Sequence, residues 1–107
     1  MLDVTPLLAA VDRFADRLRA APESRLRRGA ATEALALARE LSTRAQRAET
    51  PSAEPRVMPD AGAFAVADQV AVAGRDLAEA LRVGAAPAEG LAEAVGLVEG
   101  AMGRAFR

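Results

Sequence analysis

One carboxylate in the sequence lies within an apolar segment. Its position needs an explanation, such as acid–base chemistry or an ion pair. Residues 63–81, "AFAVADQVAVAGRDLAEAL", are apolar through their first half, yet Asp68 and Gln69 interrupt them. Asp68 could be catalytic, could form a structural ion pair, or could contact a second chain. Catalysis is the weakest of the three interpretations, because a lone carboxylate lacks the second acid, metal cluster or base that hydrolysis or proton transfer needs.

The side chains that carry most enzymatic chemistry are missing from this chain. It contains no His, Cys, Lys or Tyr. The absence of His removes the commonest general base and almost every transition-metal site, and the remaining nucleophiles have no obvious activating base. Glu89 and Glu93 are one helical turn apart, which fits a solvated face better than a magnesium site. We therefore expect a non-enzyme with no cofactor and no metal.

Six arginines gather around the first predicted helical corner. They are Arg13, Arg17, Arg19, Arg25, Arg27 and Arg28, offset by Asp16 and Glu23. Nucleic-acid binders use such a corner for phosphate contacts. However, no aromatic residues are interleaved for stacking, and the formal net charge of −1 gives no global field that would attract nucleic acid. We favour a solvated or partner-facing patch and keep nucleic-acid binding as the alternative.

On a helical wheel, residues 64–83 present apolar side chains on two sides. The core-facing side is formed by Val66, Val70, Ala73, Leu77 and Leu81. Asp68 lies almost opposite, with Phe64 one turn before it and Val72 one turn after it. A helix that is hydrophobic on both sides is usually buried on both sides.

The surroundings of Asp68 leave two interpretations of this outer side open. No basic residue occurs at i±3 or i±4, so a covered carboxylate would need an arginine from the Arg-rich first half of this chain or of another copy. Either Phe64, Asp68 and Val72 form an interface with a second subunit, or they are ordinary surface residues beside a partly exposed phenylalanine.

A second candidate interface is the glycine face of the last predicted helix. Gly96 and Gly100, with Gly103, lie opposite the apolar stripe of that helix. Glycine in an exposed helix interior costs about 0.5–1 kcal/mol relative to alanine. Either drift in composition tolerates this cost, or a second helix approaches closely at Gly96 and Gly100.

The first hairpin is predicted to occupy about residues 5–48. Thr5 is a candidate cap, and Pro6 suits the first helical position. Apolar residues recur at helical spacing in Leu7, Val11, Phe14 and Leu18. The second helix starts between Pro22 and Ser24 and runs to about residue 48. Ser24 is a possible cap. If Gly29 interrupts it, Thr32 would cap a shorter helix.

A Pro-rich linker and a second hairpin complete the predicted chain. The segment "ETPSAEPRVMP", residues 49–59, reads as extended. The second hairpin spans about residues 60–106: Asp60 caps its first helix, Gly84 ends that helix, and Pro87 opens the next. The apolar stripe of the last helix is formed by Leu91, Val95, Val98, Met102 and Phe106.

Composition agrees with this organisation. The chain has 28 Ala and 12 Leu but no Ile, which favours closely packed helices over a sheet. We predict a single domain, residues 1–107, that is all-α: an up-and-down four-helix bundle made of two helical hairpins joined by the linker.

The expected role is that of a small protein-interaction or structural module. Residues 1–56 carry ten Arg against eight acids, and residues 57–107 carry four Arg against seven acids. The first half is thus slightly positive and the second slightly negative, which suits hairpins that pack on each other or on a second copy. We expect a homodimer or a protein partner. With no basic segment near the N-terminus and no run of about 18 apolar residues, we expect a cytoplasmic chain with no membrane contact.

Overall fold

The chain forms four long helices and no strand in a computed structural model that describes residues 1–107. The long helices are α1 (Thr5–Ala20), α3 (Ala31–Glu49), α4 (Val66–Arg82) and α5 (Gly90–Ala105). A single turn, α2 (Glu23–Arg25), and a π-helical turn, η1 (Leu26–Ala30), connect α1 to α3. The prediction of an all-α four-helix bundle made of two hairpins is confirmed.

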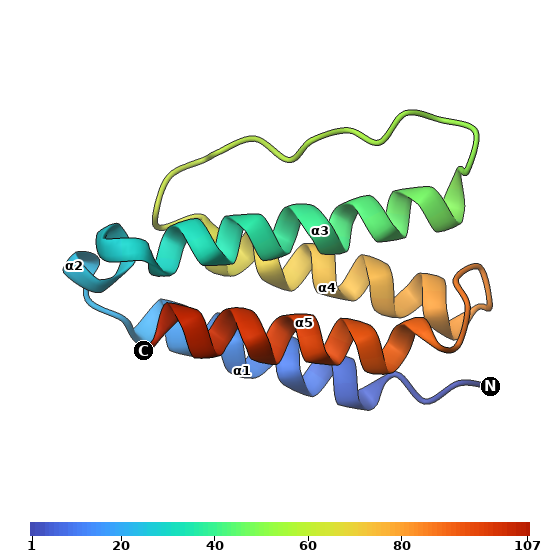
Figure 1. The fold of residues 1–107 in the computed structure, drawn as a ribbon, viewed down its shortest axis with the longest axis horizontal. Helices are drawn as coiled ribbons and strands as arrows, with labels where there is room; N and C mark the ends of the chain where they lie inside the picture. The colour runs from blue at the N-terminus through green and yellow to red at the C-terminus, as the bar shows by residue number, and fades with distance from the viewer.

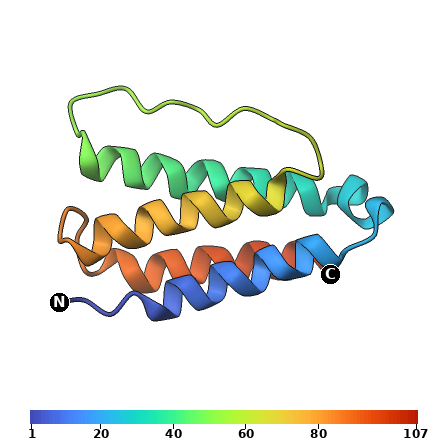
Figure 2. The same ribbon diagram turned by 180° about the vertical axis from the view of Figure 1, so that it is seen from behind.

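Each helix of one hairpin packs on both helices of the other. α4 contacts α1 and α3, and α5 contacts the same two helices from the other side of the bundle. Helix directions alternate within each hairpin (Figure 1). Residues 50–65 return along the length of the bundle, so α3 and α4 point the same way, as the reverse view also shows (Figure 2). The predicted up-and-down order therefore holds within each hairpin but not across this segment.

The crossover segment, residues 50–65, is tied to the bundle by side chains that bond its backbone. Gln46 on α3 accepts from the N–H of Arg56 at 2.8 Å and donates to the carbonyl of the same residue at 2.9 Å. Arg39 donates to the carbonyl of Met58 at 2.8 Å, and Gln69 donates to that of Pro59 at 2.9 Å. These bonds replace the ladder partners that an extended, proline-rich segment lacks.

Several predicted caps are wrong. Thr5 is the first residue of α1, and the N-cap residue is Val4, which makes no side-chain cap bond. The N–H of Thr5 donates to Asp3 Oδ1 at 2.9 Å, in a local turn before the helix. Asp60 accepts from the N–H of Gly62 in a local turn, and α4 begins only at Val66. The turn continues through Gly62, which has a φ of 96°, and this conformation delays the helix.

Gly29 interrupts the second predicted helix. Its φ of 142° is one that residues other than glycine rarely adopt. Neither Ser24 nor Thr32 forms a cap hydrogen bond. The N–H of Ala31 already donates to the carbonyl of Leu26, so the start of α3 does not need a side-chain cap. At the other end of the bundle, Gly84 ends α4 with a φ of 80°, as predicted.

The core is built from large residues on α1, α3 and α4 and small ones on α5. Phe14 is fully buried and contacts the ring of Phe106 edge-on, with the centroids 6.2 Å apart. The predicted stripe of α5 is only partly right, because four of its five residues are half-buried. The buried line is instead Ala94, Val98, Ala101 and Ala105. These small side chains let α5 approach α1 and α3 closely. None of the helices combines the length and apolarity needed to cross a bilayer.

Candidate functional site

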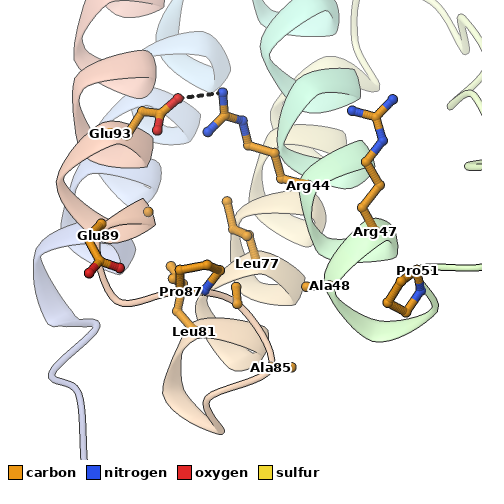
Figure 3. A pocket seen from close by; sticks show the side chains of 12 residues that line it. Arg44, Arg47, Ala48, Pro51, Leu77, Leu81, Ala85, Pro87, Glu89 and Glu93 are labelled. Carbon is orange, nitrogen blue, oxygen red and sulfur yellow. Dashed lines mark ion pairs between the residues drawn. The ribbon is translucent and has the colours of Figure 1, made fainter.

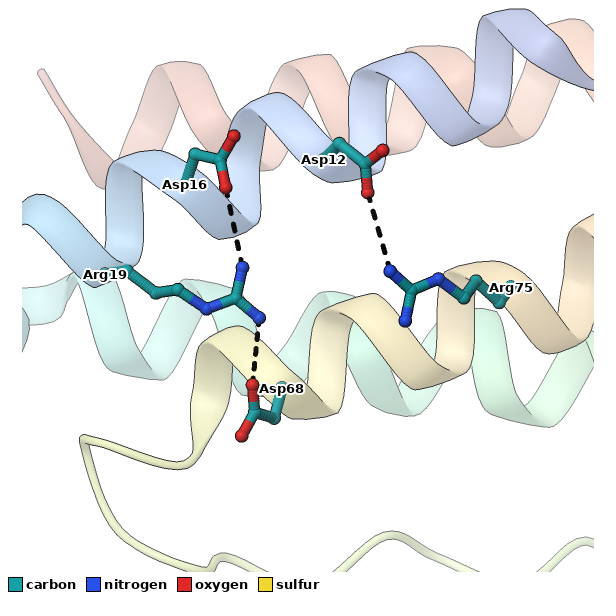
Figure 4. Close-up of polar contacts among 5 residues, drawn as sticks. All are labelled: Asp12, Asp16, Arg19, Asp68 and Arg75. Atoms are coloured by element: carbon teal, nitrogen blue, oxygen red, sulfur yellow. Dashed lines mark hydrogen bonds and ion pairs between the residues drawn. The ribbon is translucent and has the colours of Figure 1, made fainter.

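Asp68 forms an ion pair between α4 and α1. Its Oδ1 lies 2.9 Å from Arg19 Nη2 at the end of α1, and Arg19 also lies 3.5 Å from Asp16 (Figure 4). The hydrogen bond to Asp68 raises the pKa of Arg19. The side chain of Asp68 is 79% exposed, so this pair is solvated and requires no desolvation of the carboxylate. The required arginine therefore comes from the same chain.

Further along the same two helices, Asp12 and Arg75 form a second ion pair. Here the acid is on α1 and the arginine on α4, the reverse of the first pair. Arg75 Nη2 on α4 lies 4.0 Å from Asp12 Oδ1 on α1 (Figure 4). The two ion pairs therefore join α1 to α4 at two points along their length. No group of three or more acidic side chains is placed to hold a metal ion.

Much of the apolar surface of α4 outside its predicted core face is covered within the bundle. Ala67, Ala71, Gly74 and Ala78 are buried because α1 packs on that side, while α3 covers the other. The face that remains outward is mostly charged. It carries Asp68, Arg75, Asp76 and Glu79, with Val72 as its one large apolar side chain. Two helices of the same bundle thus account for most of the apolar surface of α4.

Phe64 has no such explanation within the chain. It lies in the turn before α4, and it is 72% exposed, while Val72 is 53% exposed. Phe64 lies at the edge of a hollow of about 180 Å³ that it helps to line. We call this region the Phe64 surface; it is formed by Leu18, Arg19, Ala21, Leu26, Ala63, Phe64, Val66 and Ala67. It therefore joins a protruding ring and an apolar depression.

The glycine face of α5 is open. A Cβ atom on Gly96 would meet nothing within 4 Å, and one on Gly100 would meet only the Arg104 guanidinium, at 3.3 Å. The glycine that does allow close approach is Gly74, where a Cβ atom would lie 2.6 Å from Val11 Cγ2 on α1. Sequence reasoning missed Gly74, although it follows Val70 by one turn on the core side of α4.

The six arginines of the predicted patch have different environments. Arg17 stacks its guanidinium 4.1 Å from the centroid of the Phe106 ring, toward α5, whereas Arg19 bonds to α4. Arg27 pairs with Glu23 one turn away. Arg13 has no hydrogen-bond or ion-pair partner. Arg25 and Arg28 instead join two arginines from the end of α5, Arg104 and Arg107, around one hollow.

The largest hollow, about 570 Å³, lies at the opposite end of the bundle, between the end of α3 and the α4–α5 loop (Figure 3). Leu77 and Leu81 form part of its wall. Arg44 spans its edge, because its guanidinium lies 2.8 Å from Glu93 on α5 and 2.8 Å from Glu40 on its own helix. The bonds to Glu93 and Glu40 raise the pKa of Arg44, and the pKa of Glu93 is lowered in return.

Comparison of the chain with protein-family models, with curated proteins and with solved structures found no match. The function of the chain is therefore inferred from its own exposed residues. Their chemistry consists of guanidinium–carboxylate pairing and of apolar contact at the Phe64 surface. Both are interactions used in binding.

Proposed function

We propose that this chain is a protein-interaction module that self-associates as a two-fold dimer through the Phe64 surface. The observation that supports this proposal is that a 72% exposed phenylalanine lies beside an apolar hollow on the same face. A single exposed apolar side chain is normal on a monomer. A protrusion next to a matching depression is different, because a two-fold interface needs a patch that is complementary to itself.

In such a dimer, Phe64 of each copy enters the hollow of the other. The walls of the hollow that would receive the ring are formed by Leu18, Ala21 and Leu26. Aromatic anchors bury on the order of 150–250 Å² each and dominate the energetics of many interfaces. The two-fold axis doubles this contribution, since the same contact occurs twice.

The charges at the edge of the Phe64 surface are compatible with a second copy. Arg19 already neutralises Asp68 within the chain, at 2.9 Å, and both signs occur on the outer face of α4. Two identical surfaces brought together would therefore meet mixed charges and not a single sign, which avoids like-charge repulsion. Val72 extends the apolar contact beyond this ion pair.

The proposal is tested by the mass of two matched variants in light scattering after size exclusion. Phe64→Asp places a charge in the contact, whereas Val57→Asp places the same charge on a 74% exposed valine of the crossover segment. We expect Phe64→Asp to have a lower mass than the wild type, Val57→Asp to be unchanged, and both to keep the wild-type circular dichroism. Equal masses for all three proteins would overturn the proposal.

A further inference from the structure

Four arginines from separate parts of the sequence surround one hollow at the α2 end of the bundle. Arg25 and Arg28 come from the turns between α1 and α3, and Arg104 and Arg107 come from the end of α5. With Gly29, Ala30, Glu33 and Ala105 they enclose about 390 Å³, which we call the arginine hollow. We propose that the arginine hollow binds a small phosphate-bearing anion. This site is separate from the proposed dimer interface.

The charges in the arginine hollow are unbalanced. Its four guanidinium groups face one side-chain carboxylate, that of Glu33, which accepts from Arg104 Nε at 3.0 Å. Arg25 donates one bond to the carbonyl of Arg107, at 3.2 Å, and its other N–H groups remain available. The side chains of Arg28 and Arg107 have no hydrogen-bond or ion-pair partner. Two of the four guanidinium groups, those of Arg28 and Arg107, thus lie at the arginine hollow without a partner.

Several arginines elsewhere on the molecule are paired with carboxylates, in contrast to most of those at the hollow. Arg19, Arg27, Arg44 and Arg82 each bind a carboxylate in an ion pair. At the arginine hollow, by contrast, only Arg104 is paired with an acidic side chain, that of Glu33. Repulsion among converging guanidinium groups is relieved when an anion enters between them.

The shape of the arginine hollow favours phosphate over other anions. Its volume falls within the range of about 300–1,000 Å³ that is usual for small-molecule sites. Guanidinium groups match phosphate oxygens in a two-pronged geometry, and four groups arranged around a hollow suit a tetrahedral group better than a planar carboxylate, which one or two arginines satisfy. Apart from arginine stems, the wall offers only the small apolar side chains Ala30 and Ala105. The recognised part is therefore the charged group.

The fold holds the arginines in place through an unusual backbone. Gly29, with its φ of 142°, follows Arg28 directly and turns the chain within η1, shortly before α3. Glu33, one turn into α3, fixes Arg104 from the other side. A groove for a nucleic-acid backbone would instead spread its charges along a stripe and add aromatic rings for stacking. The arginine hollow has neither feature, which favours a compact ligand.

The test measures binding of inorganic pyrophosphate to the full chain by calorimetry and by phosphorus NMR line broadening. Arg28→Gln/Arg107→Gln removes two unpaired guanidinium groups from the site. Arg47→Gln/Arg56→Gln makes the same change in net charge away from it and serves as the control. The four substituted side chains are exposed and form no ion pair: Arg28, Arg107, Arg47 and Arg56. Both variants should therefore keep the wild-type helicity.

We expect saturable one-to-one binding to the wild type, a loss of about tenfold or more in affinity in the Arg28/Arg107 variant, and little change in the control. Phosphorus line broadening provides a readout that does not depend on protein stability. Two results would overturn the proposal: no saturable pyrophosphate binding to the wild type, or equal weakening in both variants. In the first case, salt-dependent binding of a DNA duplex would indicate a nucleic-acid site instead. A dimerisation-deficient Phe64→Asp chain should still bind pyrophosphate, so the two proposals fail separately.

Discussion

Gly74 of α4 lies directly against the side chain of Val11 on α1. A Cβ atom at Gly74 would be 2.6 Å from Val11 Cγ2 and 2.7 Å from Val11 Cγ1. Real Cβ atoms do not come this close. The two helices can therefore pack at their present distance only because position 74 has no side chain. The contact sets the distance between the helices that carry Asp68 and Arg19.

Gly74→Ala should therefore destabilise the protein, by about 1–3 kcal/mol, because added methyl groups in a packed core force backbone or side-chain shifts. The double variant Gly74→Ala/Val11→Ala should lose less than the sum of the two single variants, since the deleted valine methyls leave room. Urea unfolding followed by circular dichroism measures both quantities. Additive losses would show that the two residues do not contact each other as described.

Gly96→Ala should have the opposite effect. A Cβ atom there meets nothing within 4 Å, and the residue is exposed in the interior of α5. Alanine should raise the free energy of unfolding by about 0.5–1 kcal/mol, since it lowers the entropy of the unfolded chain. If the glycine face were the dimer interface, the same change would lower the mass of the assembly, which light scattering would detect.

Acid should weaken the contact between α3 and α5. The hydrogen bond from Arg44 lowers the pKa of Glu93 below its ordinary value of 4.5. A depressed carboxyl pKa contributes stability that is present above the ordinary value and is lost as the pH falls through the lower folded value. Stability should therefore fall below about pH 4.5. In Glu93→Gln this part of the acid dependence should be absent, whereas Glu89→Gln should retain it; identical pH profiles for both variants would contradict the assignment.

The chain has no native Cys, so single spin labels can locate the dimer interface. A label on Arg75→Cys lies one turn beyond Val72 on the outer face of α4, and a label on Ala92→Cys lies one turn before Gly96 on α5. Double electron–electron resonance should give a short distance between copies for the Arg75 position and a longer one for Ala92. The reverse order would place the second copy on the glycine face.

Helix content and the C-terminal ends of helices are what the sequence predicts best in this chain. The 4, 3, 4 spacing of Leu7 to Leu18 and the stop at Gly84 both correspond to the structure. The predicted cap at Asp60 is wrong because a carboxylate can equally close a local turn with Gly62, and only tertiary packing decides between these two uses. The spacing pattern also misjudged α5, where alanines and not the larger residues lie deepest.

The candidate sites were harder to predict, since they depend on contacts between distant residues. Asp68 and Arg19 are 49 positions apart, and Arg25 and Arg107 are 82 apart. Local spacing contains no information about either pair. The role of the outer side of α4 stays a prediction, because Phe64 and Val72 are exposed and a helical wheel cannot distinguish an ordinary surface from one that a partner covers.

Sedimentation equilibrium of the wild-type chain measures self-association without any substitution. Detection is by refractive index, because Trp and Tyr are absent. As concentration rises from micromolar to millimolar, the weight-average mass should climb from the 11.1 kDa of one chain toward twice that value and stop there. A mass that stays at one chain over this whole range would contradict the dimer, and with it the role assigned to Phe64.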